Sequence, residues 1–484
     1  MTFEIPNLSL ALPEIVLLTL TSLLLVADTF WSRTCRDCTY WATQITLVIV
    51  GWLVFSDFAT QTQVTFDGSF VRDTLSDVLK LFIVVVSIGI FLFSREYLLQ
   101  NRAYYGEFFV LGLFGVLGMF VMVSAYNLIT LYLGLEIMSL ALYAMIAMQR
   151  HSDRASEAAM KYFVLGALAT GMMLYGMSML YGATGTLELT GIAQKIASGE
   201  VDNAVLAFAL VFIVIGLAFK LGAVPFHMWV PDVYHGAPTA MTLYLASAPK
   251  IAAFAMLYRL LWDGLQQALP DWQGMLVILA ALSMVVGSVI AIAQTNLKRM
   301  LAYSGIGHVG FVLMGVAAGD AEGFASAMFY IVVYAITSVA AFGLMISLAR
   351  AGMEFEEIDD YKGLNDRNPW LALMMLFVMF SMAGVPPFIG FFVKVAVIEA
   401  AVNAGLVWLA VLAVVMAVVS AFYYLRVVKV MYFDKPVETS RLEPISTQLG
   451  LAVSLSASVL LLFGLFPGWI MELCYRSLGL SVVA

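Results

Sequence analysis

The chain has 484 residues, of which 62% are hydrophobic and only 12% are charged, with a formal net charge of −8. The charged share is about half of that in an ordinary soluble domain, so composition excludes a soluble globular protein. The acidic balance and the lack of a basic patch in the sequence exclude a nucleic-acid partner. We therefore expect the lipid bilayer to be the solvent of this chain.

Apolar runs that are long enough to span a bilayer, about 20 residues each, recur along the whole chain. They predict an all-α polytopic membrane protein with about 14 transmembrane helices. We expect these helices at residues 8–28, 41–58, 75–97, 107–123, 126–148, 157–182, 203–231, 238–261, 272–293, 299–318, 323–349, 370–399, 403–432 and 447–471. The first run lacks a charged leader and a cleavage site, so we expect it to be retained as a helix.

The distribution of basic residues predicts the orientation of these helices. With the N-terminus outside, sixteen basic residues fall at the inside ends and four at the outside ends. The positive-inside rule expects this bias, which predicts that both termini lie outside. The inside set is Arg33, Arg36, Arg95, Arg102, Arg150, Arg154, Lys161, Lys298, Arg299, Arg350, Lys362, Arg367, Arg426, Lys429, Lys435 and Arg441, and the outside set is Arg72, Lys195, Arg259 and Arg476.

The four remaining basic residues, Lys80, Lys220, Lys250 and Lys394, fall within the expected spans. A lysine at the centre of a spanning helix costs roughly 2.5–3.5 kcal/mol, so such lysines are candidates for function. Lys80 lies about two turns into its helix, and we expect its long side chain to snorkel to the interface. For Lys250 and Lys394, snorkelling is the alternative to carrying a proton in the interior.

Two expected spans are interrupted by glycine and proline, at GAVPF (222–226) and GVPPF (384–388). Interruptions in corresponding positions indicate an internally repeated transporter. Helices 4–8 and 9–13 would then form two five-helix repeats of opposite orientation across the membrane, each with a broken helix. This organisation predicts three N-terminal helices in 1–106, repeats in 107–261 and 262–432, and a C-terminal helix in 433–484.

Two further polar residues lie near the middle of expected spans. An isolated carboxylate at Glu136 would be neutral unless it were paired, and Lys220 in the same expected repeat is its natural partner. The alternative to a proton-handling pair is a fixed ion pair that only holds two helices together. His308 suits a proton relay, but a core histidine that donates to a backbone carbonyl would fit the same position.

The sequence offers no site for a cofactor or a metal. Cys35 and Cys38 form a single C-x-x-C, whereas a zinc site needs a second pair of ligands. We expect both thiols to be reduced. The sequence contains no phosphate-binding loop and no dinucleotide fingerprint, so we expect no cofactor or metal in this chain and no electron transfer through it.

Three segments resemble the antiporter-like membrane subunits of respiratory complex I: FKLGAVPFHMWVPDVYHGAP (219–238), QTNLKRMLAYSGIGHVGFVLMG (294–315) and YKGL (361–364). The resemblance is strong over helices 4–13. It implies one proton path in the subunit, with relay residues at Glu136, Lys220, Lys250, Lys394, His308 and Glu157.

The resemblance also implies how such a subunit works. Redox chemistry in partner subunits, which hold FMN and iron–sulfur clusters, would disturb the Glu136–Lys220 pair. The charge change would pass through Lys250 to Lys394, which releases a proton to the outer side. Other membrane-arm subunits, neighbouring antiporter-like subunits among them, would be the partners, in a bacterial inner membrane with both termini periplasmic. Two alternatives stay open: a subunit of a multi-subunit sodium/proton antiporter, and a purely structural membrane spacer.

Overall fold

The computed structural model describes residues 6–31, 36–100, 106–149, 151–349, 354–435 and 445–480. The first half of the chain contains η1 (Leu8–Ala11), α1 (Leu12–Phe30), α2 (Arg36–Ser56), β1 (Gln63–Thr65), β2 (Phe70–Arg72), α3 (Thr74–Gln100), α4 (Gly106–Val123), α5 (Leu128–Ile146), α6 (Asp153–Thr184), α7 (Leu189–Ala197), α8 (Asn203–Leu221), α9 (Trp229–Gly236), α10 (Thr239–Ala246), α11 (Ala248–Tyr258) and the π-helix η3 (Arg259–Gly264).

The second half contains η4 (Gln266–Ala268), α12 (Leu269–Ile292), α13 (Leu297–Ala317), α14 (Ala321–Leu348), η5 (Ile358–Tyr361), α15 (Leu364–Arg367), α16 (Pro369–Ala383), α17 (Ile389–Asn403), α18 (Val407–Phe433), α19 (Thr447–Leu465) and α20 (Gly468–Ser477). In the described ranges, 13 helices are long and apolar enough to cross a membrane. The remaining expected span, 370–399, is divided between α16 and α17. The prediction of an all-α polytopic membrane protein is confirmed.

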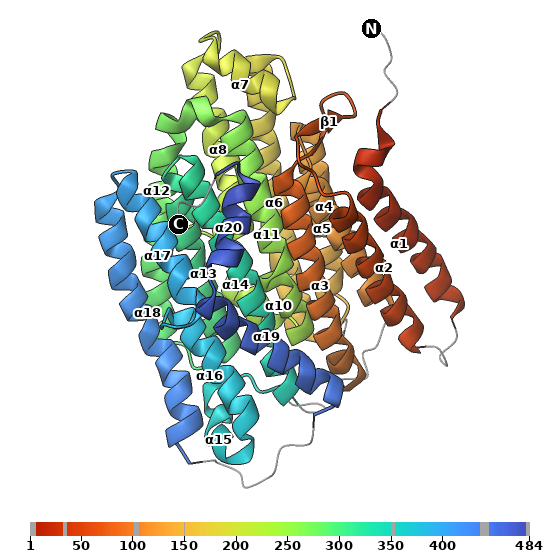
Figure 1. Cartoon of the computed structure of the whole chain (residues 1–484), viewed down its shortest axis with the longest axis vertical. Helices are drawn as coiled ribbons and strands as arrows, with labels where there is room; N and C mark the ends of the chain where they lie inside the picture. Colours follow the sequence, from red (N-terminus) through yellow and green to blue (C-terminus); the bar gives the residue numbers. More distant parts are fainter. Residues whose placement is uncertain are drawn as a thin grey trace.

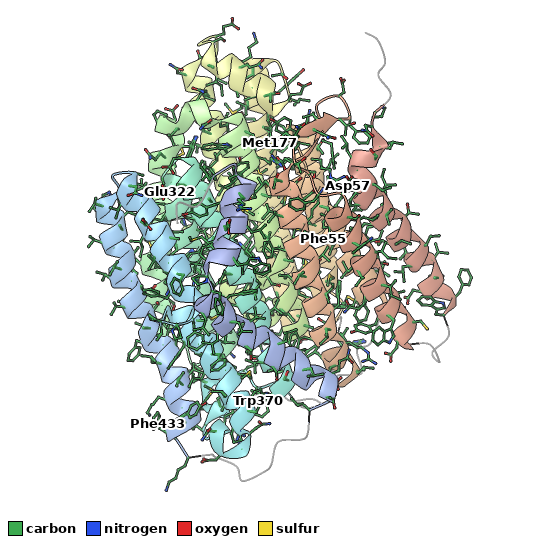
Figure 2. The ribbon with its side chains drawn as sticks, viewed as in Figure 1. Phe55, Asp57, Met177, Glu322, Trp370 and Phe433 are labelled. Carbon is green, nitrogen blue, oxygen red and sulfur yellow. The ribbon has the colours of Figure 1, made fainter. Side chains whose placement is uncertain are left out.

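The helices stand side by side, with α1 and α18 at opposite edges and α11, α13 and α14 between them (Figure 1). In an apolar 18-residue stretch of each helix, 94% of the residues are buried in α13 and in α14, against 33% in α18 and 28% in α19. These two helices instead expose apolar side chains such as Val418 of α18 and Leu455 of α19, and Phe433 at the end of α18 is exposed as well (Figure 2). An apolar rim around a buried centre is what a bilayer solvent requires, and it shields the few buried polar groups from lipid.

Two pairs of loops form matching β-bridges at opposite ends of the molecule. Asn127, before α5, forms an isolated antiparallel bridge with Glu188, before α7. Asn296, before α13, forms the same bridge with Glu357, before η5. The α7 end and the α15 end lie at opposite ends of the bundle (Figure 1). One local pattern, repeated at the two ends, is what two inverted copies of a helical unit would produce.

Close helix contacts also recur in the two halves. A Cβ atom on Gly118 of α4 would lie 2.4 Å from the Met138 nitrogen of α5. A Cβ atom on Gly287 of α12 would lie 2.5 Å from the Gly307 nitrogen of α13. Small residues let the backbones of membrane helices approach this closely.

The structure corrects two sequence expectations in the first three helices. Lys80 does not snorkel: its side chain is fully buried, and its ammonium lies 2.6 Å from the Glu14 carboxylate. Cys35 lies outside the described residues, but Cys38 is disulfide-bonded, so the expectation of a reduced thiol there is wrong. The lysine pairs inward because Glu14 of α1, 66 positions away in sequence, packs against α3.

Candidate proton-translocation site

Both interrupted spans break in the same way. The helix α8 ends at Gly222, which has φ +80°, and the Gly222 nitrogen donates to the Ala218 carbonyl at 2.9 Å. The helix α16 ends at Gly384, which has φ +84°, and the Gly384 nitrogen donates to the Phe380 carbonyl at 3.1 Å. Only glycine adopts this left-handed conformation without steric cost. The expected single span 203–231 is therefore two helices, α8 and α9.

A buried lysine binds the carbonyl end of each broken helix. The Lys250 ammonium donates to the Leu221 carbonyl at 2.6 Å. The Lys394 ammonium donates to the Met382 and Ala383 carbonyls at 3.0 and 2.9 Å. The last carbonyls of a helix lack partners within it and carry the negative end of the helix dipole, so an ammonium group stabilises them. Both lysines point inward and do not snorkel.

Lys220 lies in the last turn of α8, next to its last residue, and is also buried. Its ammonium donates a 2.7 Å hydrogen bond to the hydroxyl of Ser139 on α5. It also lies 6.0 Å from the ring centroid of Tyr143 and 5.7 Å from that of Tyr162. The lysine is therefore surrounded by a hydroxyl acceptor and two aromatic faces.

Glu136 lies on α5, one turn before Ser139, but it does not pair with Lys220. In the part of the chain that the structure describes, neither an ion pair nor a hydrogen bond joins the two side chains, and the buried Oε1 atom of Glu136 has no hydrogen-bond partner. The expected pairing of Glu136 with Lys220 is thus absent from this conformation, and so is the fixed ion pair that was its alternative. The carboxylate and the lysine are therefore near each other, but no direct contact fixes one to the other.

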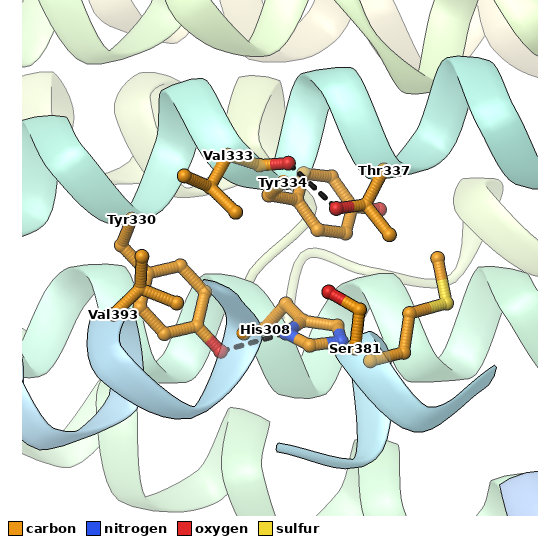
Figure 3. A pocket seen from close by; sticks show the side chains of 9 residues that line it. His308, Tyr330, Val333, Tyr334, Thr337, Ser381 and Val393 are labelled. Atoms are coloured by element: carbon orange, nitrogen blue, oxygen red, sulfur yellow. Dashed lines mark hydrogen bonds between the residues drawn. The ribbon is translucent and has the colours of Figure 1, made fainter. Parts of the chain in front are cut away.

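The ring of His308 lies between two tyrosine hydroxyls. Its Nδ1 atom is 2.7 Å from the Tyr330 hydroxyl on α14 (Figure 3). Its Nε2 atom is 3.0 Å from the Tyr424 hydroxyl on α18. The hydroxyl of Tyr424 also contacts Ser304. Because both ring nitrogens face hydroxyls, His308 is part of a side-chain network and does not cap a backbone carbonyl.

A cavity of about 20 Å³ adjoins this histidine (Figure 3). Its lining includes His308, Tyr330, Ser381 and Met382, and the Ser381 hydroxyl has no hydrogen-bond partner. A cavity of this size with several polar groups holds about one water molecule. Met382 lines this cavity, and its carbonyl accepts a hydrogen bond from Lys394. Met382 therefore links the cavity beside His308 to that lysine.

The structure does not bring Glu157 to the buried lysines. It lies near the start of α6, with 66% of its side chain exposed, and pairs with Lys161 at 2.8 Å. Lys161 also pairs with Asp232 on α9, which in turn pairs with Arg299 on α13. Glu157 is therefore part of a surface cluster that surrounds the end of α9.

A second ionic cluster, centred on Lys298, was not predicted from the sequence. Lys298 is buried and contacts Glu354 at 2.5 Å and Glu356 at 2.7 Å, and Arg154 contacts Glu356 at 2.9 Å. Burial raises the pKa of Glu356, but the Lys298 ammonium and the hydrogen bonds from Lys298 and Arg154 outweigh it and lower the pKa to about 2. The acidic run was visible in the sequence, but nothing there linked it to Lys298.

Among the residues with described positions, no group of three or more histidine, cysteine, aspartate or glutamate side chains is arranged to hold a metal ion. Around the broken helices, the described groups include the three lysine amines, the Glu136 carboxylate and the His308 imidazole, which belong to classes of side chain that can exchange protons. Two broken helices that end on buried lysines define a polytopic, antiporter-like membrane protein.

Sequence comparison identifies the family to which the chain belongs. The sequence profile described as NADH:quinone oxidoreductase/Mrp antiporter, TM, matches residues 125–420. The chain belongs to this family. It is 66% identical over 478 residues to NADH-quinone oxidoreductase subunit N of Hydrogenovibrio crunogenus, covering 99% of this chain and 100% of the relative.

Solved structures agree with this assignment. A chain of respiratory complex I from Thermus thermophilus with bound aureothin is 30% identical, with a TM-score of 0.82 over 96% of this chain and 99% of that one. A chain of the membrane-bound sulfane sulfur reductase, an archaeal respiratory membrane complex, is 25% identical, with a TM-score of 0.83 over 98% and 97%. Each match covers nearly all of both chains, so the fold is shared from end to end.

Proposed function

We propose that this chain is a proton-translocating membrane subunit of NADH:quinone oxidoreductase. As part of that enzyme complex, it couples electron transfer from NADH to quinone in partner subunits to proton transport across the membrane. The relative that is 66% identical carries the name of such a subunit. The observation that carries the proposal is the set of three buried lysines that bind neutral oxygen atoms and not carboxylates.

The relay that we propose starts at Glu136 and Lys220, continues to Lys250, and ends at Lys394. His308 and its tyrosine network adjoin the cavity beside the end of α16, and Glu157 belongs to the surface cluster beside α9. A hydroxyl or a carbonyl tolerates both the charged and the neutral form of a lysine far better than a buried carboxylate would. Each lysine can therefore gain and lose a proton without leaving an unpaired buried carboxylate beside it.

Electrostatic coupling would connect these groups. Two unit charges about 7 Å apart interact by roughly 2.4 kcal/mol at an effective dielectric constant near 20. That energy exceeds the 1.36 kcal/mol of one pKa unit, so a change of charge at one group is enough to change proton occupancy at the next. Redox chemistry in partner subunits, with FMN and iron–sulfur clusters, would drive the first step.

We also propose the wider arrangement. The repeats would occupy 107–261 and 262–432, between three N-terminal helices in 1–106 and a C-terminal helix in 433–484, and the matching bridges at Asn127 and Asn296 support this division. The location that we propose is a bacterial inner membrane, and the bias of basic residues supports an orientation with both termini periplasmic. Neighbouring antiporter-like subunits, other membrane-arm subunits and lipid would cover the apolar rim.

The test is Lys220→Ala in the intact complex. Inverted membrane vesicles are given NADH, and acidification and quinone-linked NADH oxidation are measured together. We expect assembly to persist and proton pumping to fall. Lys195→Ala, an exposed lysine paired with Glu200, is the matched control and should pump normally. Normal pumping by Lys220→Ala would refute the proposal.

The second candidate is a subunit of a multi-subunit sodium/proton antiporter, because the description of the matching family also names Mrp antiporters. Purification of the intact complex separates the two. Recovery with a flavin and iron–sulfur arm supports the oxidoreductase, and recovery of a complex without redox subunits supports the antiporter. A purely structural spacer predicts that Lys250→Ala and Lys394→Ala change stability without changing pumping.

A further inference from the structure

Ser139 contacts the first lysine of the proposed relay. It lies on α5, three positions after Glu136, and its side chain is completely buried. The Ser139 hydroxyl accepts the hydrogen bond from the Lys220 ammonium at 2.7 Å and donates to the Leu135 carbonyl at 2.5 Å. Residues three apart on a helix lie on the same side, so Ser139 and Glu136 present neighbouring oxygen atoms to α8.

The direction of these hydrogen bonds selects the charged form of the lysine. A serine hydroxyl has one proton, and here that proton goes to the Leu135 carbonyl. Toward Lys220 the hydroxyl oxygen is therefore an acceptor only. An ammonium group has three donors and no acceptor, and hydrogen bonds from charged donors are the stronger ones. Ser139 thus stabilises protonated Lys220 without adding a charge.

The groups that face Lys220 from the neighbouring helices are few. On α5 they are Glu136 and Tyr143, on α6 Tyr162, and on α11 Lys250. Tyr162 stacks on Trp229 of α9 with ring centroids 4.7 Å apart, and the Lys250 ammonium lies 5.7 Å from the Trp229 ring centroid. Glu136 is therefore the single acidic group among them, and its buried Oε1 atom has no hydrogen-bond partner.

We propose that Ser139 is a positioning residue that holds the protonated Lys220 side chain on α5 while no ion pair joins Lys220 to Glu136. Lys220 then has two positions on the same side of α5, one on the Ser139 hydroxyl and one on the Glu136 carboxylate. The flexible four-carbon stem of lysine permits this short movement. The inference deepens the proposed function and rests on it. Ser139 would stabilise the conformation in which Lys220 is charged and is not paired with the Glu136 carboxylate.

The test compares pH profiles of proton pumping in the assembled complex. Ser139→Ala removes the acceptor without adding volume, so we expect the alkaline limb of the profile to move to lower pH by about one unit, the size of a lost charge-assisted hydrogen bond. Ser139→Cys, a weak acceptor, should show the same displacement. Ser139→Thr retains a hydroxyl and should restore the original profile. Ser94→Ala is the control, since buried Ser94 makes the same bond to the Ile90 carbonyl on α3.

The outcomes separate this inference from the proposed function. If the profiles of Ser139→Ala and Ser139→Cys are unchanged or move to higher pH, or if Ser139→Thr fails to restore the profile, Ser139 does not position Lys220. If the Ser139 inference fails in this way but Lys220→Ala pumps poorly in the same experiment, the proposed function still stands. Normal pumping by Lys220→Ala would remove the proposed function itself, whatever the serine variants do.

Discussion

The Lys394 ammonium donates a 2.9 Å hydrogen bond to the carbonyl of Ala383, the last residue of α16. In the first half of the chain, Lys250 makes the matching contact with Leu221, the last residue of α8. The lysines come from different places in the two halves: Lys394 follows the break in its own span, whereas Lys250 belongs to the next span. What recurs is the contact between an ammonium and a helix end.

Two replacements of Lys394 distinguish the effect of its positive charge on stability from the effect of its titration on pumping. In Lys394→Met the Met382 and Ala383 carbonyls lose their donor, so we expect pumping to fall and the thermal stability of the complex to decrease by about 1.5–3 kcal/mol. Lys394→Arg keeps a charge that does not deprotonate, so stability should recover while pumping stays low. Vesicle acidification and thermal denaturation measure the two effects. Full pumping by the arginine variant would contradict a titrating role.

Glu136→Gln distinguishes a titrating carboxylate from a structural ion pair. Removal of one partner of a buried ion pair costs about 3–5 kcal/mol. Because Lys220 is bound by Ser139, we expect the melting temperature of the complex to stay close to that of the unmodified protein. Proton pumping should nevertheless fall, because in the proposed relay the redox step acts first on this carboxylate. A large loss of stability would indicate that the ion pair dominates in the membrane.

The buried pair of Glu14 and Lys80 should behave in the opposite way. Glu14→Ala leaves an unpaired ammonium in the interior of the first three helices, so we expect a loss of about 3–5 kcal/mol. The double replacement of Glu14 by leucine and Lys80 by methionine should recover most of that loss and pump normally. Thermal denaturation of the two variants measures the loss and its recovery, and vesicle acidification measures pumping. A pumping defect in a stable double variant would show that this pair also handles protons.

The Lys298 cluster predicts how stability depends on acid. The pKa of Glu356 is about 2 in the folded chain, below its ordinary value of 4.5. Its contribution to stability is therefore complete above pH 4.5 and is lost as the pH falls toward 2. Thermal denaturation of the purified complex between pH 7 and 3 measures this loss, and Glu356→Gln should remove that part of the pH dependence. Asp359→Asn, at an exposed carboxylate paired with Lys362, is the control and should leave the acid dependence unchanged.

The sequence predicted the spans and their breaks because both follow from local chemistry. About 20 apolar residues are needed to cross a bilayer, and this length is visible without knowing which helices touch. Gly222 and Gly384, with the prolines after them, end their helices through backbone conformation alone. The cost of burying a charge in lipid likewise identified Lys220, Lys250 and Lys394 as interior groups.

The sequence by itself determined which side chains had to be hidden from lipid, whereas the tertiary structure decided what each of them contacts. Lys220 was expected to bind Glu136 and instead binds Ser139, one turn away on the same helix. Lys80 and Lys298 were assigned to the membrane surface, yet each is buried against carboxylates from distant segments. The physical reason is that a partner is selected by which faces of two helices meet. That choice depends on packing between residues far apart in sequence, and no local pattern records it.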